Sequence, residues 1–148
     1  MSSKAGACVF CRVVAGELPS VVIREDEHTL AFLDIAPAAD GHTLVVPKHH
    51  TEDLLSVDPD DLCAVTRSMQ KVTHLLQDRL EPEGFSVFQS NRAAGWQDVF
   101  HLHFHVVPRW RGDGLRLPWR SSPASPQRTA RVTAALGVGD GPRAPGRD

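Results

Sequence analysis

The hydrophobic positions of this chain follow two different periods. Short apolar runs of high β-propensity at 21–23, 29–33, 42–47 and 85–88 predict four strands, bounded by glycine, proline or acidic residues. From 58 to 82 the apolar residues recur every three or four positions instead, which predicts one long helix. Asp58 as N-cap and Pro59 at the first position predict where this helix begins.

A further segment, 97–109, alternates polar and apolar residues with a period of two. We predict that it is a fifth strand whose apolar residues enter the core and whose other face carries His101, His103 and His105. Neighbouring imidazoles would then lie roughly 6.5–7 Å apart. A solvated edge strand is the alternative interpretation, but three histidines in register within so apolar a frame favour a functional site.

The order of these elements predicts an α+β fold, an antiparallel sheet of about five strands with one long helix packed on it. We expect a catalytic domain over 1–111 and a C-terminal extension over 112–148, with a short helix near 127–136 and a flexible tail after it. A short helical segment is also expected at 51–55, with Thr51 as cap. Cys63 is expected to be a buried thiol, and His74 to lie at the surface.

Size and charge exclude several classes of protein. The 148 residues suit one domain with a proper core. The net charge of -2, with mixed signs, argues against a nucleic-acid partner, although a local cluster could still bind a small anion. No segment approaches the roughly 20 apolar residues of a membrane span, so no membrane partner is expected. Residues 1–7 do not resemble a signal peptide, and with three cysteines, an odd number, we expect a cytoplasmic protein with free thiols.

Cys8 and Cys11 form a Cys-x-x-Cys motif, which is weak evidence by itself. It is compatible with a redox pair, with half a zinc site, or with two small residues near a turn; a redox motif would follow a βα unit, which is absent here. A closed site of two sulfurs and two nitrogens fits structural zinc. His50 and His101 would complete it, with His49 as a competitor for His50 because periodicity cannot say which of the two points inward.

His103 is the best candidate for a catalytic group because histidines on both sides can orient it. A neutral imidazole with one nitrogen held by a backbone carbonyl presents the other as a nucleophile or base. Phosphorus is the expected target, since neighbouring histidines can donate hydrogen bonds to phosphoryl oxygens. Neither a Walker loop nor an acidic cluster for Mg²⁺ accompanies the strand, so we expect chemistry through a phosphohistidine that requires no magnesium. A cupin-like oxygenase would need a carboxylate at facial-triad spacing and more strands.

The segment His101-Leu102-His103-Phe104-His105-Val106-Val107 resembles the HφHφHφφ signature of the histidine triad (HIT) superfamily, in which φ is apolar. Other segments of the family occur here in the same order: the cysteine motif at 8–11, Gly-Glu-Leu-Pro-Ser at 16–20, Ala-Phe-Leu-Asp-Ile at 31–35, Gly-His-Thr-Leu-Val-Val-Pro-Lys at 41–48, and His50. The resemblance covers roughly two thirds of the chain and leaves the C-terminal part unsupported.

The resemblance implies a nucleotide hydrolase acting at the α-phosphate of nucleoside phosphoramidates or related purine nucleotide conjugates. His103 would be the nucleophile that forms a nucleotidyl-histidine, supported by His105 and His42. Asp34 would hold the ribose hydroxyls, Phe32 and Ile35 would line the base pocket, and further nucleotide contacts would come from Ser90, Asn91, Gln97 and Asp98. The resemblance also implies a homodimer and, in the branch with the cysteine motif, zinc bound by Cys8, Cys11, His50 and His101.

Three departures from the family pattern bear on the substrate. Trp96 stands where many members have glycine, and Asp98 where small hydroxyl residues are common. Ser90 and Asn91 share the position of an asparagine that contacts phosphate. A carboxylate beside a phosphate is unfavourable unless it points away or binds a cationic leaving group. The alternatives are a dinucleoside polyphosphate hydrolase or phosphorylase, a nucleotidyl transferase, and a non-catalytic nucleotide-binding protein.

Overall fold

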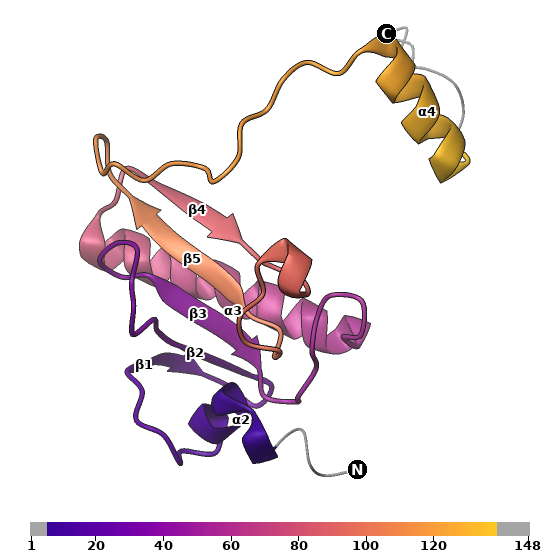
Figure 1. The fold of residues 1–148 in the computed structure, drawn as a ribbon. Helices are drawn as coiled ribbons and strands as arrows, with labels where there is room; N and C mark the ends of the chain where they lie inside the picture. The colour runs from indigo at the N-terminus through magenta and orange to yellow at the C-terminus, as the bar shows by residue number, and fades with distance from the viewer. Residues whose placement is uncertain (1–5, 139–148) are drawn as a thin grey trace, which may run out of the picture. The chain divides into compact units, whose positions relative to one another are not determined.

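The structure is a computed structural model that describes residues 6–138, so most of the predicted tail, 139–148, lies outside the described residues. A five-stranded sheet forms its centre (Figure 1), with strand order β1-β2-β3-β5-β4 and antiparallel pairing throughout. The strands are β1 (Val22–Glu25), β2 (Thr29–Leu33), β3 (Thr43–Pro47), β4 (Gly84–Phe88) and β5 (Phe104–Arg109). This architecture confirms the predicted α+β fold.

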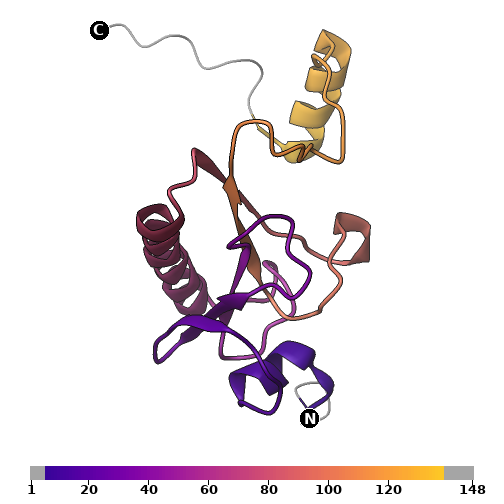
Figure 2. The same ribbon diagram turned by 90° about the vertical axis from the view of Figure 1, so that its left-hand side faces the viewer.

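The long helix α3 (Pro59–Leu80) packs on one face of the sheet (Figure 2). Asp58 caps it as predicted, because its Oδ1 accepts a hydrogen bond from the Asp60 N–H at 2.8 Å. The helix ends at Glu81, which adopts a left-handed conformation with φ of 49°. Its buried stripe includes Val65, Val72 and Leu76, which joins α3 to the sheet.

Side chains of the central strands enter two separate cores because both faces of the sheet are covered. Ala31, Val45 and Val106 face α3. The alternate positions of β2 and β3 face the other side, where the core consists of Phe10, Leu30, Phe32, Leu44 and Val46. Double-sided burial explains why these strands are nearly continuous apolar runs. Because His105 pairs directly with Leu44, the His105 side chain lies on the face opposite α3.

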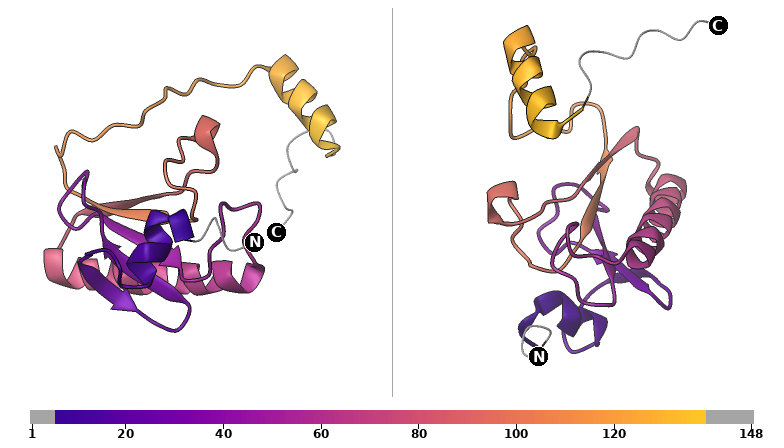
Figure 3. Two further views of the ribbon diagram at one scale, coloured as in Figure 1. Left: turned by 60° about the horizontal axis from the view of Figure 1, so that its bottom comes forward. Right: turned by 90° about the vertical axis from the view of Figure 1, so that its right-hand side faces the viewer.

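A short helix, α2 (Val9–Val14), lies on the side of the sheet opposite α3, as does the 3₁₀ turn η1 (Ala93–Gly95); Figures 2 and 3 show both. The sequence did not predict α2. Its three valines have low helix propensity, so its stability comes from burial of Phe10 and from its cap. Cys8 is the N-cap, and its sulfur accepts from the Cys11 N–H at 3.5 Å.

Two local predictions were wrong. The segment 51–55 contains turns instead of a helix. The Asp53 carboxylate accepts backbone N–H groups from Leu55 and Ser56, both at 3.1 Å, so the side chain closes a tight turn in place of the helical ladder. Cys63 is exposed, because it lies beside the apolar stripe of α3 on the solvent side. His74 is exposed, as predicted.

The histidine strand is shorter than predicted. β5 begins at Phe104, where β3 first supplies a pairing partner, and β4 pairs from His105 onward, so His101 and His103 precede the strand in irregular backbone. Both are nevertheless buried, with 0% and 3% exposure, and the Leu102 side chain is fully buried as well.

The chain divides after Gly114 into two compact units, each described by itself. The second unit contains α4 (Pro126–Leu136), where the sequence predicted a helix near 127–136. Ser125 caps α4 by accepting from the Arg128 N–H at 3.2 Å, and Gly137 ends it with φ of 64°. Within 6–138, the structure has no helix whose length and apolar character would let it cross a membrane.

Candidate active site and metal centre

The segment that precedes β5 is held by side-chain bonds instead of strand pairing. The Gln97 side chain is buried and accepts from the Arg92 N–H at 2.6 Å, while its amide donates to the carbonyl oxygens of Glu52 at 2.6 Å and Val99 at 3.1 Å. The Leu102 N–H donates to the Thr51 carbonyl at 2.8 Å. Gln97, predicted to contact the nucleotide, thus uses its polar atoms to fix the loop that carries the histidines.

His103 has one ring nitrogen engaged and one turned toward Asp98. Its Nδ1 lies 2.7 Å from the His101 carbonyl oxygen, which can only accept, so Nδ1 carries the proton. The neutral ring therefore has its lone pair on Nε2, the form that a nucleophile requires. The Phe10 ring packs edge-on against His103 at 5.1 Å between centroids, which restricts rotation of the imidazole.

His42 and His105 form a hydrogen-bond relay whose direction is set by the backbone. Nδ1 of His42 accepts from the Ala38 N–H at 3.0 Å, so Nε2 of His42 carries the proton. That nitrogen lies 2.9 Å from Nδ1 of His105 and donates to it. The remaining nitrogen of His105, Nε2, must then carry a proton and can donate to a phosphoryl oxygen.

Burial keeps both histidines of the relay neutral. It lowers the pKa of His42, although the charge of Asp34 partly opposes the shift. The pKa of His105 is lowered to about 4, first by burial and then by the neighbouring His103 and His42. Because both rings are neutral at pH 7, each carries one proton, and the hydrogen bond can run only from His42 to His105.

Asp34 completes this group, with its Oδ2 3.6 Å from Nε2 of His42. Asp34, His42 and His105 offer three ligand atoms within 4.8 Å of one another, the donor set of some metal sites. The Ala38 N–H argues against a metal here, because it requires Nε2 of His42 to be protonated, and a protonated nitrogen cannot bind a cation. The cluster is better described as a proton relay.

Phe88 belongs to the site, although the sequence indicated only a strand residue. It pairs directly with His105 across β4 and β5, and the two rings stack at 4.3 Å with an interplanar angle of 11°. Directly opposed residues in an antiparallel pair share a face, so register was the signal that could have identified Phe88. The stacked ring limits the orientations that His105 can adopt.

The other residues predicted to contact the nucleotide differ in their burial and in their hydrogen bonds. Phe32 is buried in the core beneath α2, and Ile35 is 95% exposed. The Asn91 side chain accepts from the Leu54 N–H at 2.7 Å and bonds the Gln89 amide, so it joins two loops, while Ser90 beside it is half-buried. These contacts stay predictions.

Trp96 and Asp98 stand at the entrance to the histidine segment. Trp96 is 59% exposed and has φ of 68°, a left-handed conformation that is rare for a bulky residue. Asp98 is also exposed, and its Oδ1 lies 3.7 Å from Nε2 of His103. A carboxylate therefore lies beside the lone pair of the candidate nucleophile.

A second group of side chains comes together between α2, the end of β3 and His101. Nδ1 of His101 lies 3.5 Å from the sulfurs of both Cys8 and Cys11, and 3.3 Å from Nδ1 of His50. The Cys11 sulfur is 3.3 Å from the same His50 nitrogen. His49, the alternative to His50, turns away and bonds Asp61 at 3.0 Å.

These distances fit a tetrahedral zinc ion. Zinc bonds of about 2.3 Å to sulfur and about 2.05 Å to nitrogen place sulfur and nitrogen ligands roughly 3.6 Å apart, and two nitrogens roughly 3.3 Å apart. Nε2 of His101 donates to the Pro47 carbonyl at 2.8 Å, which leaves its Nδ1 lone pair directed at the cluster. Burial lowers the pKa of His101 to about 4, which favours the neutral ring that a metal needs. Without a cation, burial and the neighbouring Cys8 raise the pKa of Cys11 to about 11.

Comparison with known proteins shows which family this chain resembles. A family model described as "HIT domain" matches residues 15–112. A HIT-like protein of Methanocaldococcus jannaschii is 44% identical over 107 residues, which cover 72% of this chain and 82% of that protein. An adenosine 5′-monophosphoramidase of Schizosaccharomyces pombe is 37% identical over 122 residues, which cover 82% and 89% of the two chains. The solved structure of a Zn-bound histidine triad family protein from Mycobacterium smegmatis matches with a TM-score of 0.72 and 37% identity, covering 90% of this chain and 95% of that one.

Proposed function

This chain belongs to the HIT domain family, and from that premise we propose that it is a nucleotide hydrolase acting at the α-phosphate of nucleoside phosphoramidates or related conjugates. One observation supports the proposal above the others: His103 donates its Nδ1 proton to the His101 carbonyl and so has its lone pair on Nε2. The Schizosaccharomyces pombe relative named as an adenosine 5′-monophosphoramidase supports the choice of substrate.

In the proposed reaction the lone pair of His103 Nε2 attacks the α-phosphorus while the P–N bond breaks. The electron pair of that bond stays on the leaving nitrogen, which takes a proton from solvent. The imidazole becomes positively charged. The His101 carbonyl stabilises this charge by accepting the hydrogen bond from Nδ1–H, with 2.7 Å between the nitrogen and the oxygen. Water then attacks the phosphorus of the nucleotidyl-histidine, and the P–Nε2 bond breaks with its electron pair returning to Nε2. The attacking water gives its proton to solvent, so the nucleoside monophosphate is released and the ring is neutral again.

The relay supplies a hydrogen-bond donor to the phosphate. Nε2–H of His105 would bond a non-bridging oxygen, in the tautomer imposed by His42 and the Ala38 N–H. This donor is fixed before the substrate arrives, so little reorganisation accompanies the build-up of charge. Asp34, whose side chain is 17% exposed, would accept from the ribose hydroxyls.

We also propose a structural zinc ion held by Cys8, Cys11, His50 and His101, because their donor atoms fit a tetrahedral site. Bound zinc would supply stability by linking α2 to the end of β3 and to the histidine segment. It would also keep Phe10 of α2 against His103, where the two ring centroids are 5.1 Å apart.

Association into a homodimer stays a prediction, which sedimentation velocity of the purified protein would test.

Turnover of a fluorogenic adenosine phosphoramidate tests the enzymatic proposal. We expect the wild type to hydrolyse it and His103→Ala to lose nearly all activity, with AMP binding retained. His74→Ala, which changes an exposed histidine of α3, is the control. If the wild type binds AMP but shows no turnover above His103→Ala, the protein is a nucleotide-binding module and the enzymatic proposal fails.

A further inference from the structure

Asp98 is well placed to act on the departing group of the proposed reaction. Its Oδ1 is 3.7 Å from Nε2 of His103, and the backbone N–H of Val99 donates to the same oxygen at 2.9 Å. That bond holds the carboxylate in place, although the side chain is 83% exposed. In a displacement by His103 the departing atom lies beyond the phosphorus, in line with the attacking Nε2.

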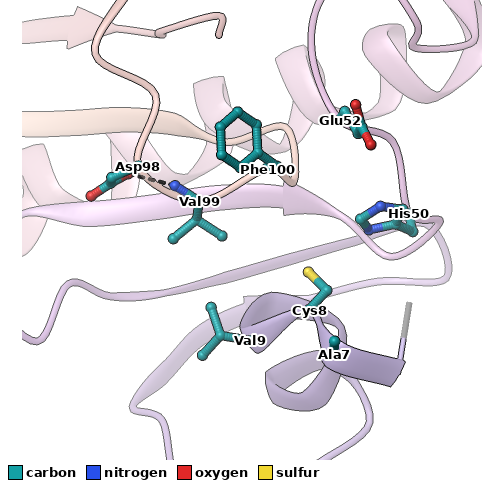
Figure 4. A pocket seen from close by; sticks show the side chains of 8 residues that line it. All are labelled: Ala7, Cys8, Val9, His50, Glu52, Asp98, Val99 and Phe100. Carbon is teal, nitrogen blue, oxygen red and sulfur yellow. Dashed lines mark hydrogen bonds between the residues drawn. The ribbon is translucent and has the colours of Figure 1, made fainter. Parts of the chain in front are cut away.

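A cavity of about 560 Å³ adjoins Asp98 (Figure 4). Its wall is largely apolar: Val99 points toward α2, and Val9 of α2 points back toward Val99. Asp98 lies at one end of the cavity and Glu52 toward the other. Cys8 and His50, two of the proposed zinc ligands, also line it. Within the described part of the chain, the lining includes neither lysine nor arginine.

This distribution of charge discriminates between classes of leaving group. A polyphosphate leaving group would require cationic side chains, as sites for phosphate chains generally do. It would instead meet Asp98. An amine with a carbon stem and a positive charge would place its stem against Val9 and Val99 and its charge near a carboxylate.

We propose that this cavity receives the leaving group and that Asp98 is a specificity-determining residue that selects amines carrying positive charge over anionic leaving groups. The inference rests on the proposed function, because it concerns the departing half of the same substrate. The chemistry balances as before: the P–N electron pair remains on the leaving nitrogen, which takes one proton from solvent and departs as a neutral amine. A second proton from solvent then converts the released amine to an ammonium ion. Asp98 transfers no proton in this step; it acts through its charge.

Two substrates that differ only in the charge of the leaving group test the proposal. In one, AMP is linked through nitrogen to 1,4-diaminobutane, which leaves a terminal ammonium; in the other, it is linked to 4-aminobutanoate, which leaves a terminal carboxylate. Both break the same P–N bond, so the ratio of their kcat/KM values isolates the charge of the leaving group. We expect the wild type to prefer the cationic substrate by about tenfold or more at low salt.

Asp98→Asn removes the charge and keeps the size of the side chain. We expect it to lower the preference to about threefold or less. Glu27→Gln is the matched control, because it removes an exposed carboxylate, 87% accessible, in the turn between β1 and β2. We expect its preference to equal that of the wild type. The wild-type preference should also weaken at about 0.5 M salt, as screening requires.

The possible failures are distinguishable. If the wild type hydrolyses neither substrate, the proposed function fails and this inference fails with it. If the wild type hydrolyses both equally well, or if Asp98→Asn keeps the full preference, the proposed function stands and only the role of Asp98 is refuted. A preference that high salt leaves unchanged reflects shape instead of charge, and it also refutes the inference.

Discussion

The direction of the His42–His105 relay can be tested by replacing each nitrogen of His42 separately. The amide oxygen of asparagine occupies nearly the position of Nδ1, which lies 3.0 Å from the Ala38 nitrogen. His42→Asn therefore keeps the acceptor for the Ala38 N–H and loses the donor to His105. Glutamine reaches the position of Nε2, so His42→Gln keeps the donor to His105 and loses the acceptor for Ala38. The two variants therefore separate the two hydrogen bonds of one buried ring.

The expected magnitudes follow from these contacts. His42 is 5% exposed, so a partner left unpaired by either substitution costs about 1–3 kcal/mol. In His42→Gln the unpaired group is the backbone N–H, and the loss appears in the free energy of unfolding. In His42→Asn the donor that fixes the tautomer of His105 is lost, and kcat/KM should fall by about ten- to a hundredfold.

Urea unfolding and kcat/KM on an adenosine phosphoramidate measure the two losses, and His74→Asn is the surface control. Both variants should lose stability, but His42→Asn should be the less active of the two. Equal losses of activity in both variants would refute the reasoning. Nitrogen NMR of the wild-type histidine rings provides a test that needs no turnover: a proton on Nδ1 of His105 at pH 7 would reverse the proposed direction.

Three further predictions follow from the structure. Purified protein should contain about one zinc per chain, and Cys8→Ser should lose the metal and unfold at lower temperature; elemental analysis that finds no zinc, with unchanged melting of the variant, would contradict this. Phe88→Leu removes the ring stacked at 4.3 Å on His105, so kcat/KM should fall by about two- to tenfold while far-UV circular dichroism stays the same. The pKa values of His42 and His105 are lowered by folding, the latter to about 4, so the unfolded chain binds more protons below its ordinary histidine pKa of 6.5. The stability should therefore be full above that value and fall as the pH drops from 6.5 toward 4, and urea midpoints that do not change between pH 7 and 5 would refute it.

Elements with local signals were predictable from the sequence. The cap at Asp58, the proline after it and the apolar stripe define α3 without reference to any other part of the chain. β2 and β3 likewise follow from continuous runs of β-branched and apolar residues. The cysteine and histidine motifs indicated which residues to consider for a metal and for catalysis, because those residue types at those spacings have few other uses.

Other features depend on partners that are distant in sequence. Alternation along 97–109 is compatible with any extended chain, but a strand needs hydrogen-bonding neighbours, and β3 and β4 provide them only from Phe104 onward. The short helix α2 depends on burial of Phe10 and on contacts with the histidine segment, which no local pattern records.

The sequence by itself thus determined α3 and the central strands β2 and β3, the set of chemically active residues and the expectation that His103 is their centre. The tertiary structure decided that His50 instead of His49 faces the cysteines, that Phe88 stacks on His105, and that the Ala38 N–H orients the relay. The physical reason is that a side chain's direction and its tautomer depend on the atoms it meets. Those atoms belong to strands and loops that only folding brings together.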